Sequence, residues 1–271
     1  MTADIAISTY KTEGISRIAN GSLPHIPDVR YVISWQAHDN APVPETLAER
    51  DDITVVRFDG HGQSHNRNNA LIHCTSDIII ISDDDLTYFP ENITALIKAF
   101  EDNPEMEIAT FRSIHDTGIK YPDTQTRLTI PLPRNYYVSC FEIALRRDSG
   151  AAALRFNTEL GLNSPRLHGG EDEVFIYSAV KRGLNCQFIP LTICEHPDIS
   201  TGLKGCLTPA NLRAMGTVIT LYYPTTAPLR IILKALRLRR KAQSGFFKAL
   251  YFLGQGLAGT PAFKRRTRRY L

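Results

Sequence analysis

Residues 76–90 read SDIIIISDDDLTYFP, and this stretch decides the fold class. Residues 78–81 are four consecutive isoleucines, a run too short for a buried helix and typical of a central strand covered on both faces. Three acids, Asp83, Asp84 and Asp85, follow almost at once. Ligands of open α/β sheets bind at the carboxyl ends of the strands, so we expect these acids to lie at a ligand site.

The three acids have two interpretations. Neighbouring carboxylates at the end of a buried strand repel one another unless a cation lies among them, and oxygen ligands suit Mg²⁺ or Mn²⁺, which keep open positions for water and substrate phosphates. Alternatively, the acids form a solvated turn that caps a helix beginning near Pro90. These residues alone leave both interpretations open.

The flanking segments alternate between strand and helix patterns, which indicates an α/β fold with a mostly parallel central sheet and helices on both faces. Strands are expected at residues 4–8, 29–35, 53–58, 107–111 and 136–146, and helices at 15–24, after Gly62 and from Pro90. Residues 113–135 lack periodicity and contain three prolines, so we expect an irregular loop over the site.

A second stretch with chemical potential, LHGGEDEVFIYSAVKRG, spans residues 167–183. Its two glycines let the backbone approach a ligand closely, and its acids at 171–173 occupy the expected first turn of a helix, where the helix dipole favours negative charge. The acids could equally serve only as a helix cap. A strand pattern at 186–197 then ends in CEHP, which contains His196.

Charge is divided unevenly along the 271 residues. Of the 31 Lys and Arg, 14 lie in residues 199–271, which contain no Asp or Glu, so residues 1–198 hold 17 Lys and Arg against all 28 acidic residues, a balance of −11. A basic tail of this kind binds polyanions or anionic membrane. The five scattered cysteines lack zinc-site spacing and suit a reducing cytosol, and we expect neither a signal peptide nor a membrane-spanning helix.

The basic tail contains an amphipathic helix pattern that starts at Pro228. Apolar residues recur at helical spacing at positions 229, 232, 233 and 236, and basic residues do so at 230, 234, 237 and 241. Two such faces are typical of a helix lying on an anionic membrane, although a helix packed on the rest of the protein with a solvated basic face would show the same pattern. Nucleic acid is not expected as a partner, because no recognition module is present.

Five segments in this order resemble the family-2 glycosyltransferases of the GT-A fold, especially those that build bacterial capsular and surface polysaccharides. They are ISTYK after the first strand, HNRNNAL before the acidic strand, IIISDDD, the GLN…GGEDEVF segment and the strand that ends at His196. The resemblance covers residues 4 to about 202. It implies a GT-A catalytic domain at residues 1–205, followed by a C-terminal basic, amphipathic helical segment at 206–271.

The resemblance also implies roles for individual residues. Thr9, Tyr10 and Glu13 would line the nucleotide pocket, and Arg67 would lie near the base or the phosphates. Asp83, Asp84 and Asp85 would form the DXD element, in which Asp84 faces the ribose and Asp85 holds the metal. Asp172 would be the catalytic base, and His196 an additional metal ligand.

One departure from the family pattern concerns recognition of the base. Many relatives end the second strand in an acidic pair that reads uracil, whereas this chain has Ser34, Trp35 and Gln36. Gln36 could pair with the uracil edge through its amide, which offers both a donor and an acceptor.

These features predict a metal-dependent inverting enzyme that uses Mn²⁺ or Mg²⁺. It would transfer a sugar from a nucleotide diphosphate sugar, a UDP-sugar, to a hydroxyl of a glycan or lipid-linked glycan. We expect it in the cytoplasm, with peripheral contact to the inner face of the cell membrane through residues 228–271. A non-catalytic sugar-nucleotide-binding or scaffold subunit of a membrane-associated polysaccharide assembly complex is the alternative. A sugar nucleotidyltransferase is disfavoured because ISTYKTEG lacks the Gly-rich, Arg-containing loop of that class.

Overall fold

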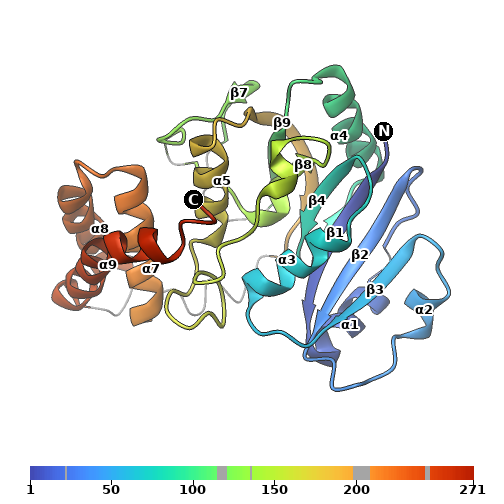
Figure 1. The fold of residues 1–271 in the computed structure, drawn as a ribbon, viewed down its shortest axis with the longest axis horizontal. Helices are drawn as coiled ribbons and strands as arrows, with labels where there is room; N and C mark the ends of the chain where they lie inside the picture. Colours follow the sequence, from blue (N-terminus) through green and yellow to red (C-terminus); the bar gives the residue numbers. More distant parts are fainter. Residues whose placement is uncertain (22, 115–120, 135, 198–207, 242–244) are drawn as a thin grey trace.

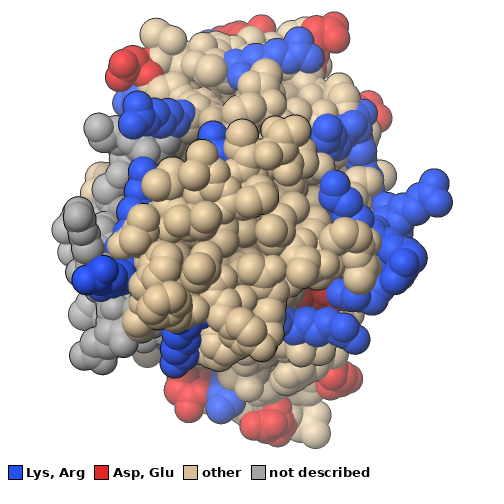
Figure 2. Space-filling view, turned by 90° about the vertical axis from the view of Figure 1, so that its left-hand side faces the viewer, with Lys and Arg blue, Asp and Glu red and all other residues tan. Residues whose placement is uncertain are grey.

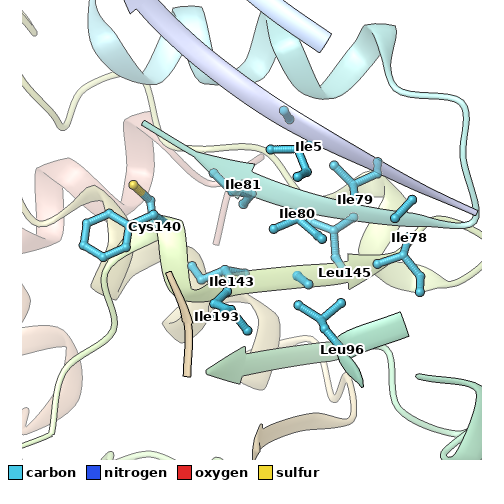
Figure 3. Close-up of a cluster of buried hydrophobic side chains, with 14 of the residues drawn as sticks. Ile5, Ile78, Ile79, Ile80, Ile81, Leu96, Cys140, Ile143, Leu145 and Ile193 are labelled. Carbon is cyan, nitrogen blue, oxygen red and sulfur yellow. The ribbon is translucent and has the colours of Figure 1, made fainter. Parts of the chain in front are cut away.

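The isoleucine run forms a buried strand, β4 (Ile78–Ser82), at the centre of the sheet, as the sequence predicts. The computed structural model describes residues 1–21, 23–114, 121–134, 136–197, 208–241 and 245–271. β4 pairs in parallel with β1 (Ala3–Tyr10) and antiparallel with β8 (Ile143–Arg146). The isoleucines of β4 lie beside Ile5, Ile143 and Leu145 in the main hydrophobic core (Figure 3).

The strands form one sheet in the order β3–β2–β1–β4–β8–β6–β9–β5, with β7 paired to β9. β3, β2, β1 and β4 run parallel, as do β6 and β9, whereas β8 is antiparallel to both of its neighbours. This arrangement confirms the expected α/β fold with a mostly parallel central sheet. The remaining strand bounds are β2 (Val29–Gln36), β3 (Ile53–Phe58), β5 (Thr87–Tyr88), β6 (Ile108–Ile114), β7 (Thr126–Arg127) and β9 (Cys186–Glu195).

The helices connect the strands through crossovers that run in opposite directions along the sheet. The chain passes from β1 through α1 (Lys11–Asn20) to β2, then through α2 (Glu45–Ala48) to β3, and returns through α3 (Gln63–His73) to β4 on the other side of β1. Right-handed crossovers of opposite direction place α1 and α3 on opposite faces of the sheet (Figure 1). The connections therefore diverge between β1 and β4, which is where α/β sheets bind ligands.

Residues 136–146 differ from the continuous strand that the sequence predicts. The chain forms a 3₁₀ turn, η1 (Cys140–Glu142), and only Ile143–Arg146 is a strand. Ser139 and Glu142 form a reciprocal capping box at η1, in which the Ser139 N–H donates to Glu142 Oε2 over 3.2 Å. This local pairing favours a turn over an extended chain.

Two further elements differ in extent from the sequence-based expectation. α1 begins at Lys11, ahead of the expected residue 15, and ends before Gly21, whose N–H bonds back to the Arg17 carbonyl. The expected loop at 113–135 includes the end of β6 and all of β7, and its residues 115–120 lie outside the described part of the chain. α4 (Pro90–Asp102) and α5 (Glu171–Lys181) begin where predicted, and η2 (Gly150–Ala153) follows β8.

Three helices form the end of the molecule opposite β2 and β3: α7 (Pro209–Tyr222), α8 (Ala227–Lys241) and α9 (Phe246–Arg266) (Figure 1). α7 and α9 approach closely because a glycine lies on each at the contact. A Cβ on Gly216 would come within 2.1 Å of the Leu253 carbonyl oxygen, and a Cβ on Gly256 within 2.2 Å of the Arg213 carbonyl oxygen. Only hydrogen atoms fit between the two backbones there.

The same helices share a hydrophobic cluster with the body of the protein. Leu221, Tyr222 and Phe263 of α7 and α9 pack with Val174 and Tyr177 of α5. The boundary expected between residues 205 and 206 lies outside the described residues. Within the described ranges, none of the helices combines the length and apolarity needed to cross a membrane.

Candidate active site

The site lies at the carboxyl ends of β1 and β4, where the first and second acids of the triad take different partners. Asp84 turns toward β1 and accepts hydrogen bonds from Thr9 Oγ1 and from the Arg17 guanidinium, both at 2.5 Å. Burial raises the pKa of Asp84, although both donors favour its ionised form. A Cβ on Gly14 would lie 2.7 Å from Asp84 Oδ2, so a glycine is needed there.

Asp83 turns instead toward Arg67, which is only 3% exposed. Arg67 NH2 donates to Asp83 Oδ1 over 2.9 Å, and NH1 faces Glu171 Oε1 at 3.1 Å and Asp172 Oδ1 at 3.3 Å. Burial opposes the charge of Arg67, but the surrounding carboxylates hold its pKa well above the usual value. Arg67 thus joins the end of β4 to the start of α5, and its expected place near the base or the phosphates stays a prediction.

Asp172 is the second residue of α5. The helix begins directly after two glycines whose backbone is in the left-handed region, Gly169 (φ 100°) and Gly170 (φ 82°). Asp172 Oδ2 accepts the N–H of Cys140, at the start of η1, over 3.0 Å. Burial raises the pKa of Asp172 well above its ordinary value, although Arg67 opposes the shift. The side chain is 21% exposed, so part of it faces solvent.

Asp85, the third acid, faces His196. β5 pairs antiparallel with the end of β9, and this pairing brings Asp85, two residues before β5, close to His196, the residue after β9. His196 Nε2 lies 3.7 Å from Asp85 Oδ1, and its Nδ1 lies 2.7 Å from the Pro197 carbonyl oxygen, so Nδ1 carries a proton. The ring stacks on Phe141 at a centroid distance of 5.0 Å. In the neutral ring Nε2 therefore presents a lone pair toward Asp85.

The Asp85 carboxylate is buried without full hydrogen bonding. No described residue donates a hydrogen bond to its Oδ1, and burial together with the charge of Asp83 raises the pKa of Asp85. Elsewhere in the cluster, Glu171 Oε2 likewise receives no hydrogen bond from the described residues. Among those residues, no set of three His, Cys, Asp or Glu side chains is arranged to hold a metal. Asp85 and His196 thus offer two ligands.

The residues expected to contact the nucleotide differ in how buried they are and in which hydrogen bonds they make. Thr9 lies within the site through Asp84, whereas Tyr10 and Glu13 are exposed where β1 passes into α1. Gln36 is 4% exposed, and its Nε2 donates to the Gly60 carbonyl over 2.6 Å. One of its two amide hydrogens is therefore engaged within the protein, which leaves the other hydrogen and the carbonyl for a base.

Two contacts in the site were not predicted from the sequence. Arg17 gives no signal there, because it reads as one basic residue on an exposed helix face. The Cys140 N–H is a backbone group, and its role depends on the turn that replaces the expected strand. The capping pair of Ser139 and Glu142 was the available signal for that turn.

Residues 39–158 match the model of glycosyl transferase family 2. The match includes α3 and the acid triad and ends before Asp172. No curated protein sequence matches the chain significantly.

The fold is that of S. aureus TarS. The structure of TarS 1–349 in complex with UDP aligns with a TM-score of 0.59 at 13% identity and covers 97% of this chain and 92% of that one. The complex with UDP-GlcNAc also gives 0.59, at 12% identity with 98% and 93% covered. A longer TarS structure gives 0.54 at 14% identity, and 54% of its length is covered. The family model matches less than half of the chain, and the likeness to TarS shows a shared GT-A fold.

Proposed function

We propose that this protein is a metal-dependent inverting glycosyltransferase that moves a sugar from a UDP-sugar to a hydroxyl of a glycan in surface polysaccharide biosynthesis. One observation carries the proposal: Arg67 holds Asp83, at the end of β4, and Asp172, at the start of α5, in one cluster. A candidate donor-binding acid and a candidate base therefore lie on either side of one arginine. The family match and the TarS complexes with UDP and UDP-GlcNAc favour a nucleotide sugar as donor.

The donor would lie across the carboxyl ends of β1 and β4. Thr9 and Asp84 are bonded to each other there, and Asp84 is the acid expected to face the ribose. Arg17, on the same carboxylate, supplies a positive charge beside the anionic donor. Tyr10 and Glu13 are close enough in sequence to border the same donor, and the Gln36 amide would pair with the base through its carbonyl and its second amide hydrogen.

A divalent metal fits Asp85 and His196. An unbonded carboxylate oxygen and a histidine lone pair face each other, and the second ring nitrogen of His196 is fixed by a backbone carbonyl, a common support for metal-binding histidines. Donor phosphates and water would supply the other ligands. Mn²⁺ or Mg²⁺ bound there would act as a Lewis acid that stabilises negative charge on the departing nucleoside diphosphate.

Asp172 would act as the general base. The acceptor oxygen attacks the anomeric carbon as the bond from that carbon to the diphosphate oxygen breaks, and Asp172 takes the hydroxyl proton. Attack opposite the leaving group inverts the anomeric centre. The raised pKa of Asp172 suits this role, because a base is most effective when its pKa lies near the working pH.

Asp172→Asn tests the proposal directly. The amide keeps the shape of the side chain and can still accept the Cys140 N–H, but it cannot take a proton. We expect thermal-shift binding of UDP-sugars to persist and the transfer rate to fall by about 10²–10⁴. Transfer at the wild-type rate would remove Asp172 from the mechanism.

Asp85→Ala serves as the companion variant. We expect it to lose the Mn²⁺-dependent part of the thermal shift that a UDP-sugar produces in the wild type. Donor binding without transfer to any glycan in the wild-type protein would instead favour the non-catalytic, sugar-nucleotide-binding subunit.

A further inference from the structure

The free end of the helical segment carries an exposed apolar surface. We define the α8–α9 apolar surface by four residues of α8 and two of α9, with exposed fractions between 42% and 82%: Leu229, Ile232, Leu233, Leu236, Phe247 and Tyr251. Figure 2, which looks onto this end of the molecule, shows a broad uncharged area bordered by Lys and Arg. Contiguous apolar surface of this kind is uncommon on monomeric proteins and marks an interaction site.

The packing of α8 leaves its larger side chains outside. Ile231 and Ala235 are 2% and 0% exposed and join a cluster with Leu212 of α7 and Leu253 of α9. The stripe formed by Leu229, Ile232, Leu233 and Leu236 lies on the other side of the helix. α8 thus packs on α7 and α9 through Ile231 and Ala235 and leaves this apolar stripe exposed.

Positive charge borders this stripe on both sides. At about 100° per residue along a helix, Arg237 falls at one edge of the α8 stripe and Arg239 at the other, and both are exposed. Lys248 is exposed beside Phe247 at the start of α9. No acidic residue occurs between positions 199 and 271, so none of these charges is neutralised from within the segment.

We infer that the α8–α9 apolar surface lies on an anionic lipid bilayer. Phe247, which is 82% exposed, and Tyr251, which is 62% exposed, would enter the boundary between headgroups and acyl chains, and the bordering Arg and Lys would contact the lipid phosphates. A nucleic acid would need the positive charge at the centre of the surface, whereas here the centre is apolar. Charge complementarity thus selects the membrane, and the inference does not depend on the sugar transferred.

Liposome flotation of the full chain tests the inference, with vesicles of phosphatidylcholine alone and of phosphatidylcholine mixed with phosphatidylglycerol. We expect the protein to float with the mixed vesicles, to float less as salt increases, and to remain largely free of the neutral ones. The double variant Phe247→Ser, Tyr251→Ser should lower partitioning at least about tenfold. Arg237→Gln should lower it about fivefold on anionic vesicles only.

Ile72→Ser is the matched control, because Ile72 is 57% exposed on α3, outside the α8–α9 apolar surface. It should float as the wild type does, and all variants should keep the wild-type thermal midpoint. The inference is overturned if the protein ignores anionic vesicles, or if Ile72→Ser weakens flotation as much as the double variant. A dimer in size-exclusion chromatography that the double variant abolishes, without vesicle binding, would assign the surface to a second copy of the chain.

Discussion

At the scale of single residues, Arg67 holds together acids from two distant segments of the chain. It is the positive charge beside Asp83, Glu171 and Asp172, and it lies under the ring of Phe156 at 5.4 Å as well. Removing one partner of a buried ion pair leaves charge without compensation, which costs about 3–5 kcal/mol. We therefore expect Arg67→Gln to lower the free energy of unfolding by about that amount at neutral pH, measured by urea denaturation.

The loss should be smaller at acidic pH. Without Arg67, the folded-state pKa of Asp172 rises further above its unfolded value, so the folded variant binds more protons than the unfolded chain and gains stability as pH falls. Arg17→Gln is the control: Arg17 has a half-exposed side chain on Asp84, and its loss should cost about 1 kcal/mol or less. An equal loss for Arg67→Gln at pH 5.5 and 7.5 would contradict the explanation.

Residue types at the site could be predicted, but their pairing could not. The strand that ends in three acids, the acidic helix start and the histidine after a strand are local patterns. The structure places Asp85 beside His196 and joins Asp83 to Asp172 through Arg67, and the roles expected of these residues stay predictions. Arg67 was expected near the base or the phosphates, and no pattern in the sequence indicated that it would also bind acids up to 105 positions away. Such contacts depend on how α3 and α5 pack, and no local pattern encodes that packing.

At the scale of elements, the crossing of α7 and α9 depends on Gly216. A methyl group there would meet the Leu253 carbonyl at 2.1 Å, so the two helices would have to separate. We expect Gly216→Ala to lower the free energy of unfolding by about 1–3 kcal/mol, because overpacking a close contact costs that much. Gly259→Ala on α9 is the matched control: its Cβ would meet nothing within 4 Å, and alanine should stabilise the helix by about 0.5–1 kcal/mol. Chemical denaturation measures the free energy of unfolding of both variants. Equal changes in that free energy would show that the two helices are not in close contact at Gly216.

Strands and helices with a clear hydrophobic pattern in the sequence were predicted well. Segments whose conformation depends on tertiary contacts were not. β3 was expected at residues 53–58 and is found there, whereas the strand expected at 136–146 gives way to η1 after Ser139. The apolar content of that segment fits burial in either conformation. Its backbone conformation depends on the capping pair of Ser139 and Glu142 and on the hydrogen bond from the Cys140 N–H to Asp172. The alternation of apolar residues in the sequence carries no information about either contact.

At the scale of the whole molecule, the basic C-terminal segment is tied to the body at several points. Besides the cluster around Tyr177, Arg266 pairs with Glu159 at 2.7 Å, and the Arg182 guanidinium donates to the Arg269 carbonyl over 2.8 Å. Figure 1 shows the C-terminus returning beside α5. The C-terminal segment therefore differs from residues 1–198 in charge but does not pack as a separate unit.

We accordingly expect residues 1–271 to unfold in one cooperative transition. Removal of α7 and α9 would expose Leu160, Val174 and Tyr177 of the body, so neither part retains a complete core without the other. Fluorescence of Trp35, buried in β2, reports the sheet, and far-ultraviolet circular dichroism is dominated by the helices. Coincident urea midpoints from the two signals support one unit, and a chain ending at residue 207 should be less stable by several kcal/mol. If instead the helical signal is lost well before the Trp35 signal, the C-terminal helices form a separate unit attached to an independently stable body.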